Sequence, residues 1–104
     1  MERLSFKFNT GRSAGGTRPM AIVGVVASGN LEVLLERTLP QDRCTVEVAS
    51  AANGFASLWE AVLNDFVARY GVGGLRITVN DAGARPDTVA LRLAQGVRTL
   101  EQGP

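Results

Sequence analysis

The sequence contains no histidine and a single cysteine, Cys44, and these absences exclude several kinds of site. A structural zinc site needs clustered cysteine and histidine ligands, and an internal disulfide needs two cysteines. A nucleophilic serine usually depends on a neighbouring base, most often histidine. Carboxylates could still form a site of oxygen ligands, but those of this chain are scattered. We therefore expect no metal site and no catalytic triad.

Long apolar runs and clustered charges are missing as well. No segment approaches the ~18 consecutive apolar residues of a membrane-spanning helix. The charges in Met1–Phe8 are untypical of a signal peptide. The 11 basic and 10 acidic side chains are interspersed and leave a formal net charge of +1, so no basic face for a nucleic acid is visible. We expect a cytoplasmic protein with no membrane span and no nucleic-acid partner.

The 104 residues, 45% of them hydrophobic, are enough for one domain with a modest core. Alternation of apolar and polar residues predicts strands. These strands are expected over residues 4–8, 20–27, 31–37, 44–49 and 75–79. Cys44 shares one strand face with Val46 and Val48, which favours a small core residue over a reactive thiol. The glycine-rich segment 9–19 is predicted to be a flexible loop.

Two helices are predicted. Apolar residues over 54–70 recur at helical spacing and place Trp59 in the core, with Asn53 as N-cap and a possible capping box at Ser57 and Glu60. The segment 86–100 fits a strand or a helix, and Pro86 in the first turn favours a helix. The fold class is therefore α+β, a two-layer sandwich. An antiparallel sheet of four or five strands carries two helices on one face.

The most distinctive side chain is Ser28, in a Ser-Gly-Asn sequence between two apolar runs. Gly29 and Asn30 accept the positive φ of a short hairpin turn, so the pattern predicts a tight turn. Such a turn exposes the serine hydroxyl to solvent without a base beside it, which suits modification better than catalysis. On the local pattern alone, a serine in a hairpin is usually just an ordinary turn residue.

A second candidate is the segment from Asp81 to Pro86, between a predicted strand and a predicted helix. Its backbone amides and Arg85 could bind an anion. Alternatively, Asp81 caps its own connection. The residues leave both interpretations open.

The segment from Val26 to Glu36, which contains Ser28, resembles the sequence around the prosthetic-group serine of the acyl-carrier (delta) subunit of bacterial malonate decarboxylase. This resemblance covers nearly the whole chain. The related carrier subunit of citrate lyase is similar to the chain more distantly. The further matching segments, in the same order, are 4–8, 46–48 before the Trp59 helix, 81–86 and 89–93. The family commonly has an acidic residue where this chain has Asn30. The common four-helix carrier proteins have an Asp-Ser-Leu sequence at a helix N-terminus, whereas Ser28 follows alanine and lies between predicted strands, which argues against that fold.

The resemblance implies a non-catalytic acyl-carrier domain over residues 1–104. Ser28 would carry, through a phosphodiester, a 2'-(5''-triphosphoribosyl)-3'-dephospho-CoA arm, whose thiol bears acetyl or malonyl while malonate is converted to acetate and CO2. Gly29 would support the turn, and Arg85 is a candidate contact for a partner or a phosphate. The implied partners are the acetyl-carrier:malonate transferase (alpha) subunit, the decarboxylase (beta and gamma) subunits, the prosthetic-group transferase and a malonyl transferase.

Two other functions stay open. The chain could be an assembly or binding module of a multisubunit enzyme, without a prosthetic group. It could also be a small enzyme that uses Ser28 with Asp81 or Glu32, although the missing histidine argues against catalysis.

Overall fold

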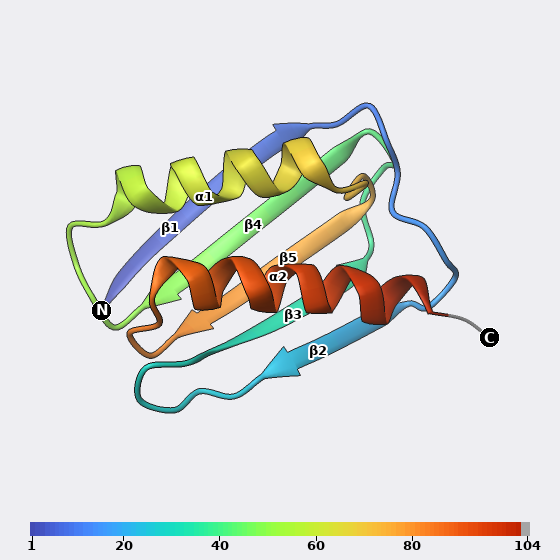
Figure 1. The fold of residues 1–104 in the computed structure, drawn as a ribbon. Helices are drawn as coiled ribbons and strands as arrows, with labels where there is room; N and C mark the ends of the chain where they lie inside the picture. Colours follow the sequence, from blue (N-terminus) through green and yellow to red (C-terminus); the bar gives the residue numbers. More distant parts are fainter. Residues whose placement is uncertain (103–104) are drawn as a thin grey trace.

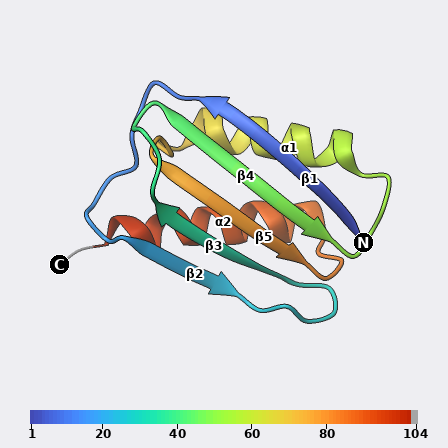
Figure 2. The same cartoon turned by 180° about the vertical axis from the view of Figure 1, so that it is seen from behind.

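The computed structural model describes residues 1–102 and has one sheet with two helices on the same face (Figure 1). Within the described residues, the opposite face of the sheet carries no helix (Figure 2). This confirms the predicted α+β class and excludes a helical bundle. The elements in chain order are β1 (Glu2–Asn9), β2 (Met20–Gly24), β3 (Leu31–Arg37), β4 (Arg43–Ser50), α1 (Ala56–Arg69), β5 (Leu75–Asp81) and α2 (Pro86–Glu101).

The strand order in the sheet is β1-β4-β5-β3-β2. Three of the neighbouring pairs are antiparallel, as predicted, but β4 and β5 are parallel, with Val46 opposite Ile77. The sheet is therefore mixed, and the prediction of a wholly antiparallel sheet was wrong for this pair. The reason is the crossover through α1, which returns the chain so that β5 runs in the same direction as β4. Alternation along a strand carries no information about its direction.

The core lies between the sheet and the helices. It is built from the inward residues of β3, β4 and β5 and from the buried faces of both helices. Trp59 is 6% exposed, which confirms its predicted place in the core. Cys44 is buried as predicted, and burial raises the pKa of its thiol to about 12. Neither helix in residues 1–102 is long and apolar enough to cross a membrane.

The element boundaries differ from the prediction at α1 and agree at α2. Helix α1 begins at Ala56 after Phe55, and no side chain caps it, so the predicted Asn53 cap and the capping box were wrong. Phe55 and Leu58 lie on the predicted apolar face but are 47% and 43% exposed, whereas Trp59 in the same turn is buried. Helix α2 starts at Pro86, as predicted, and ends one residue later than expected.

The predicted loop between β1 and β2 is irregular, and hydrogen bonds hold it to the rest of the protein. The Arg37 guanidinium donates to the carbonyls of Ala14, Gly15 and Arg18, at 3.0, 2.8 and 2.9 Å respectively. Ser13 pairs with Gly73 in an isolated bridge. The flexibility of this loop stays a prediction.

Candidate functional site

Ser28 lies in the loop between β2 and β3, at the centre of a four-residue turn. The Asn30 N–H donates to the Ala27 carbonyl at 2.8 Å, and Gly29 has φ +76°, as the third residue of a type II turn does. Ser28 is exposed, and within residues 1–102 no group forms a hydrogen bond with its hydroxyl. A tight turn with a solvent-facing hydroxyl is therefore present, but it lies within a loop between Gly24 and Leu31, and the positive φ predicted for Asn30 was wrong.

The loop of the β2–β3 hairpin is longer than predicted, because the first strand is shorter. Strand β2 ends at Gly24, not at Ala27, because Gly24 has φ +81° and bends the chain out of the ladder. A Cβ at this position would collide with the Leu31 carbonyl oxygen, so only glycine fits. As a result Val25 and Val26 lie in the loop and are 52% and 58% exposed.

The turn is held by the connection between β5 and α2. The Gly29 N–H donates to the Ala82 carbonyl at 3.0 Å, and the Ala82 N–H donates to the Asn30 carbonyl at 2.9 Å. These two bonds continue the pairing of β3 with β5 beyond Leu31 and Asp81. The two segments that the sequence singled out separately are therefore direct neighbours.

Asp81 organises this connection from inside the protein. Its side chain is buried, and Oδ1 accepts hydrogen bonds from the N–H groups of Gly83 at 3.1 Å and Ala84 at 2.8 Å. Its Oδ2 accepts the Ser50 hydroxyl at 2.8 Å. Asp81 thus caps its own connection, which was one of the two interpretations left open. These two amides are occupied by the carboxylate and do not face an external anion.

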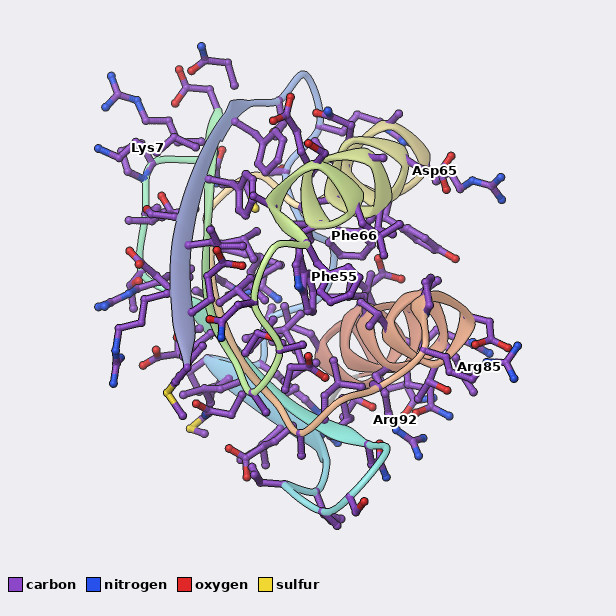
Figure 3. The ribbon with its side chains drawn as sticks, turned by 90° about the vertical axis from the view of Figure 1, so that its left-hand side faces the viewer. Lys7, Phe55, Asp65, Phe66, Arg85 and Arg92 are labelled. Atoms are coloured by element: carbon purple, nitrogen blue, oxygen red, sulfur yellow. The ribbon has the colours of Figure 1, made fainter. Side chains whose placement is uncertain are left out.

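Arg85 lies just before α2, and its side chain is 83% exposed. Its Nε is 3.5 Å from Oδ1 of Asp87, and Figure 3 shows the side chain directed away from the sheet. No hydrogen bond or ion pair in the described part of the chain links Arg85 to the Ser28 turn. Its role as a partner or phosphate contact stays a prediction.

A different arginine contacts the turn, and the sequence reasoning missed it. Arg92 lies on the side of α2 toward the β2–β3 hairpin (Figure 3). Its Nε donates to Oδ1 of Asn30 at 3.2 Å, and its Nη1 donates to Oε1 of Gln95 at 2.8 Å. No local motif marks Arg92, because the packing of α2 against β2 and β3 decides which of its side chains reaches the turn.

An apolar groove of about 270 Å³ opens beside the connection between β5 and α2, which contributes Asp81, Gly83 and Ala84 to its lining. It lies between the first turns of α1 and α2, which explains why Phe55 and Leu58 are partly exposed. The polar pair of Ser50 and Asp81 also lines it. Other lining residues include Trp59, Ala84, Pro86 and Val89.

Comparison with known proteins assigns the chain to a family. The family model for the malonate decarboxylase delta subunit (MdcD), an acyl carrier protein, matches residues 18–100 of this chain. The chain belongs to the malonate decarboxylase delta-subunit family. The matched region includes Ser28, the Asp81 connection and Arg92, so the whole site lies within the family's shared sequence.

Individual relatives agree with this assignment. The chain is 56% identical over 102 residues to the malonate decarboxylase acyl carrier protein of Bradyrhizobium diazoefficiens, with 98% of this chain and 97% of the relative covered. It is 46% identical to the protein of the same name from Xanthomonas euvesicatoria pv. vesicatoria, with 97% and 96% covered. It also resembles a chain in the crystal structure of a Pseudomonas malonate decarboxylase hetero-tetramer in complex with malonate. That chain has a TM-score of 0.84 and 39% identity, with 96% of this chain and 99% of that chain covered.

Proposed function

We propose that this protein is the acyl carrier subunit of a cytoplasmic malonate decarboxylase and that Ser28 is its attachment site for a prosthetic group. One observation carries the proposal. In a chain of the delta-subunit family, Ser28 has an exposed hydroxyl with no hydrogen bond to residues 1–102, and it lies at the centre of a turn that is bonded on one side to the body of the protein. A hydroxyl in this position is accessible to a transfer enzyme and has a rigid base.

The residues of the turn fit a phosphodiester-linked group. Gly29 and Asn30 are tied to Ala82, so the attachment point is held while the attached group extends into solvent. Arg92, bonded to Asn30, places a positive charge beside the turn. A phosphodiester carries one negative charge, which such a guanidinium favours.

The donor we propose for this group is 2'-(5''-triphosphoribosyl)-3'-dephospho-CoA, which would lose diphosphate on attachment and leave a phosphoribosyl-dephospho-CoA arm on Ser28. When attached, this arm would supply the thiol that carries acetyl or malonyl during the conversion of malonate to acetate and CO2. In the attachment reaction, the Ser28 Oγ forms a bond to the innermost phosphorus of the triphosphate, and the bond from that phosphorus to the outer two phosphates breaks. Diphosphate leaves, and the hydroxyl proton passes to a base of the transfer enzyme.

The chain's own contribution is to hold and present the attachment point. A tethered group reaches successive active sites at a high effective concentration, so the carrier itself needs no catalytic base. We expect it to visit the transferase (alpha) and decarboxylase (beta and gamma) subunits, and to be loaded by the prosthetic-group transferase and a malonyl transferase. A hetero-tetrameric relative supports multisubunit assembly. Exposed Arg85 is our candidate contact for these partners or a phosphate.

The test is the intact mass of the protein after co-expression with its loading enzymes. We expect a covalent adduct that maps to Ser28 and is absent from Ser28→Ala. Ser57→Ala, which removes another exposed serine, should keep the adduct. An unmodified wild-type chain would refute the proposal and favour the assembly module without a prosthetic group. An adduct that persists in Ser28→Ala would refute the site.

A further inference from the structure

We propose that Arg92 binds the phosphate that joins the prosthetic group to Ser28. The inference rests on the proposed function and extends it to a residue that neither the sequence pattern nor the family assignment singled out. The ligand class is a phosphodiester monoanion at the β2–β3 turn. The argument depends on three features of Arg92: its unused donors, its unbalanced charge and its restrained position.

The guanidinium is only partly engaged. Nε donates to Oδ1 of Asn30 and Nη1 donates to Oε1 of Gln95, whereas Nη2 has no partner in residues 1–102. Arginine binds phosphate through paired N–H groups, so a guanidinium with an unused nitrogen can still donate a hydrogen bond to a phosphate oxygen. Asn30 lies two residues after Ser28 in the same turn, so the hydrogen bond from Nε to Asn30 holds the guanidinium beside this turn.

The charge of Arg92 is not balanced by a carboxylate. The ion pairs in the described chain are those of Arg69 with Asp65 and of Arg85 with Asp87. Both bonded partners of Arg92 are neutral amides, and the side chain is half-buried. A half-buried cation that lacks an anion is a favourable neighbour for a phosphate, because partial burial reduces the screening by water.

The position of Arg92 is restrained before any ligand arrives. Its Cδ lies 3.3 Å from where a Cβ of residue 24 would stand, so the arginine stem packs closely over Gly24. Gln95, one helical turn further along α2, orients the other end of the guanidinium. A side chain that is already ordered loses less conformational entropy on binding than a free surface arginine does.

The experiment compares Arg92→Gln and Arg92→Lys with Arg98→Gln, a matched control that removes one charge from an exposed position on the same helix. Each variant is prepared unloaded and, after co-expression with the loading enzymes, loaded, and the adduct on Ser28 is verified by mass. The melting temperatures of the two forms and the ³¹P resonance of the serine-linked phosphate are then measured. Neither measurement depends on turnover by the complex.

We expect loading to raise the melting temperature of the wild type and of Arg98→Gln by a few degrees. In Arg92→Gln most of this rise should disappear and the ³¹P resonance should move toward that of a free phosphodiester. Arg92→Lys should keep part of both effects, because lysine retains the charge but not the paired donors. Comparing loaded with unloaded protein within each variant removes any effect of the substitution on folding itself.

Two results would overturn the inference, and they are distinguishable. A wild-type chain without an adduct on Ser28 would remove the proposed function and the inference together. If the wild type is loaded, but Arg92→Gln shows the same temperature rise and the same ³¹P resonance, the inference fails while the carrier function stands. In that second case Arg85→Gln is prepared and measured in the same way, and a loss of the temperature rise in this variant would give the phosphate contact to Arg85.

Discussion

Replacement of Gly29 by alanine tests whether the backbone of the Ser28 turn is as restrained as its geometry indicates. Gly29 has φ +76°, and no atom lies within 4 Å of the place where its Cβ would be. The substitution therefore adds no steric clash with neighbours, and its cost comes from the backbone alone. This makes position 29 a clean test of conformational strain.

The expected magnitude follows from two opposing effects. An L-residue in the left-handed region costs about 1–2 kcal/mol, whereas replacing glycine by alanine restricts the unfolded chain and stabilises by about 0.4–1 kcal/mol. Gly29→Ala should therefore lower the free energy of unfolding by roughly 1 kcal/mol. A D-alanine at the same position adopts positive φ without strain, so it should raise that free energy by about 0.4–1 kcal/mol.

The assay is urea unfolding of three proteins prepared by the same chemical ligation, with glycine, L-alanine or D-alanine at position 29. Gly11→Ala is the control, since Gly11 also has open space around its Cβ position but no positive φ, and it should not destabilise. The rate of loading of Ser28 should fall with L-alanine and persist with D-alanine, because only the former distorts the turn. Equal stability of the L- and D-alanine proteins would refute the strained-turn argument.

Further predictions concern two core residues, Trp59 and Cys44. Trp59→Ala removes a ring that is 6% exposed and should lower the free energy of unfolding, measured by urea titration, by about 3–5 kcal/mol. The neighbouring Leu58 is 43% exposed, so Leu58→Ala should lower the free energy of unfolding by less. A loss below about 1 kcal/mol for Trp59→Ala would place the ring outside the core. Cys44 should resist thiol reagents in the folded protein at pH 8 and react on unfolding, because burial raises its pKa to about 12. Between pH 9.0 and about 12 the unfolded chain loses this proton while the folded chain keeps it, so stability should fall with rising pH. Cys44→Ala should lack this contribution, and a pH dependence identical to the wild type would contradict the assignment.

Local patterns accounted for the elements and for the Ser28 turn. Alternation located the strands, and helical spacing and Pro86 located α2, because side chains two or about 3.6 residues apart share a face whatever the rest of the chain does. Burial of Cys44 and Trp59 followed from the same patterns. The Ser28 turn was recognisable because glycine accepts the positive φ that a tight turn needs, although Asn30, which was expected to share this conformation, does not. Its proposed role was recognisable only through resemblance.

The sequence by itself thus determined which segments form strands and helices and where the exposed serine lies. Tertiary structure decided the parallel pairing of β4 with β5, since strand direction depends on how α1 crosses the sheet. It also decided that Asp81 occupies its own loop amides, and that Arg92 contacts the Ser28 turn. These features join segments up to 62 positions apart in the chain. Their geometry is set by the packing of helices on the sheet, which no local spacing of residues encodes.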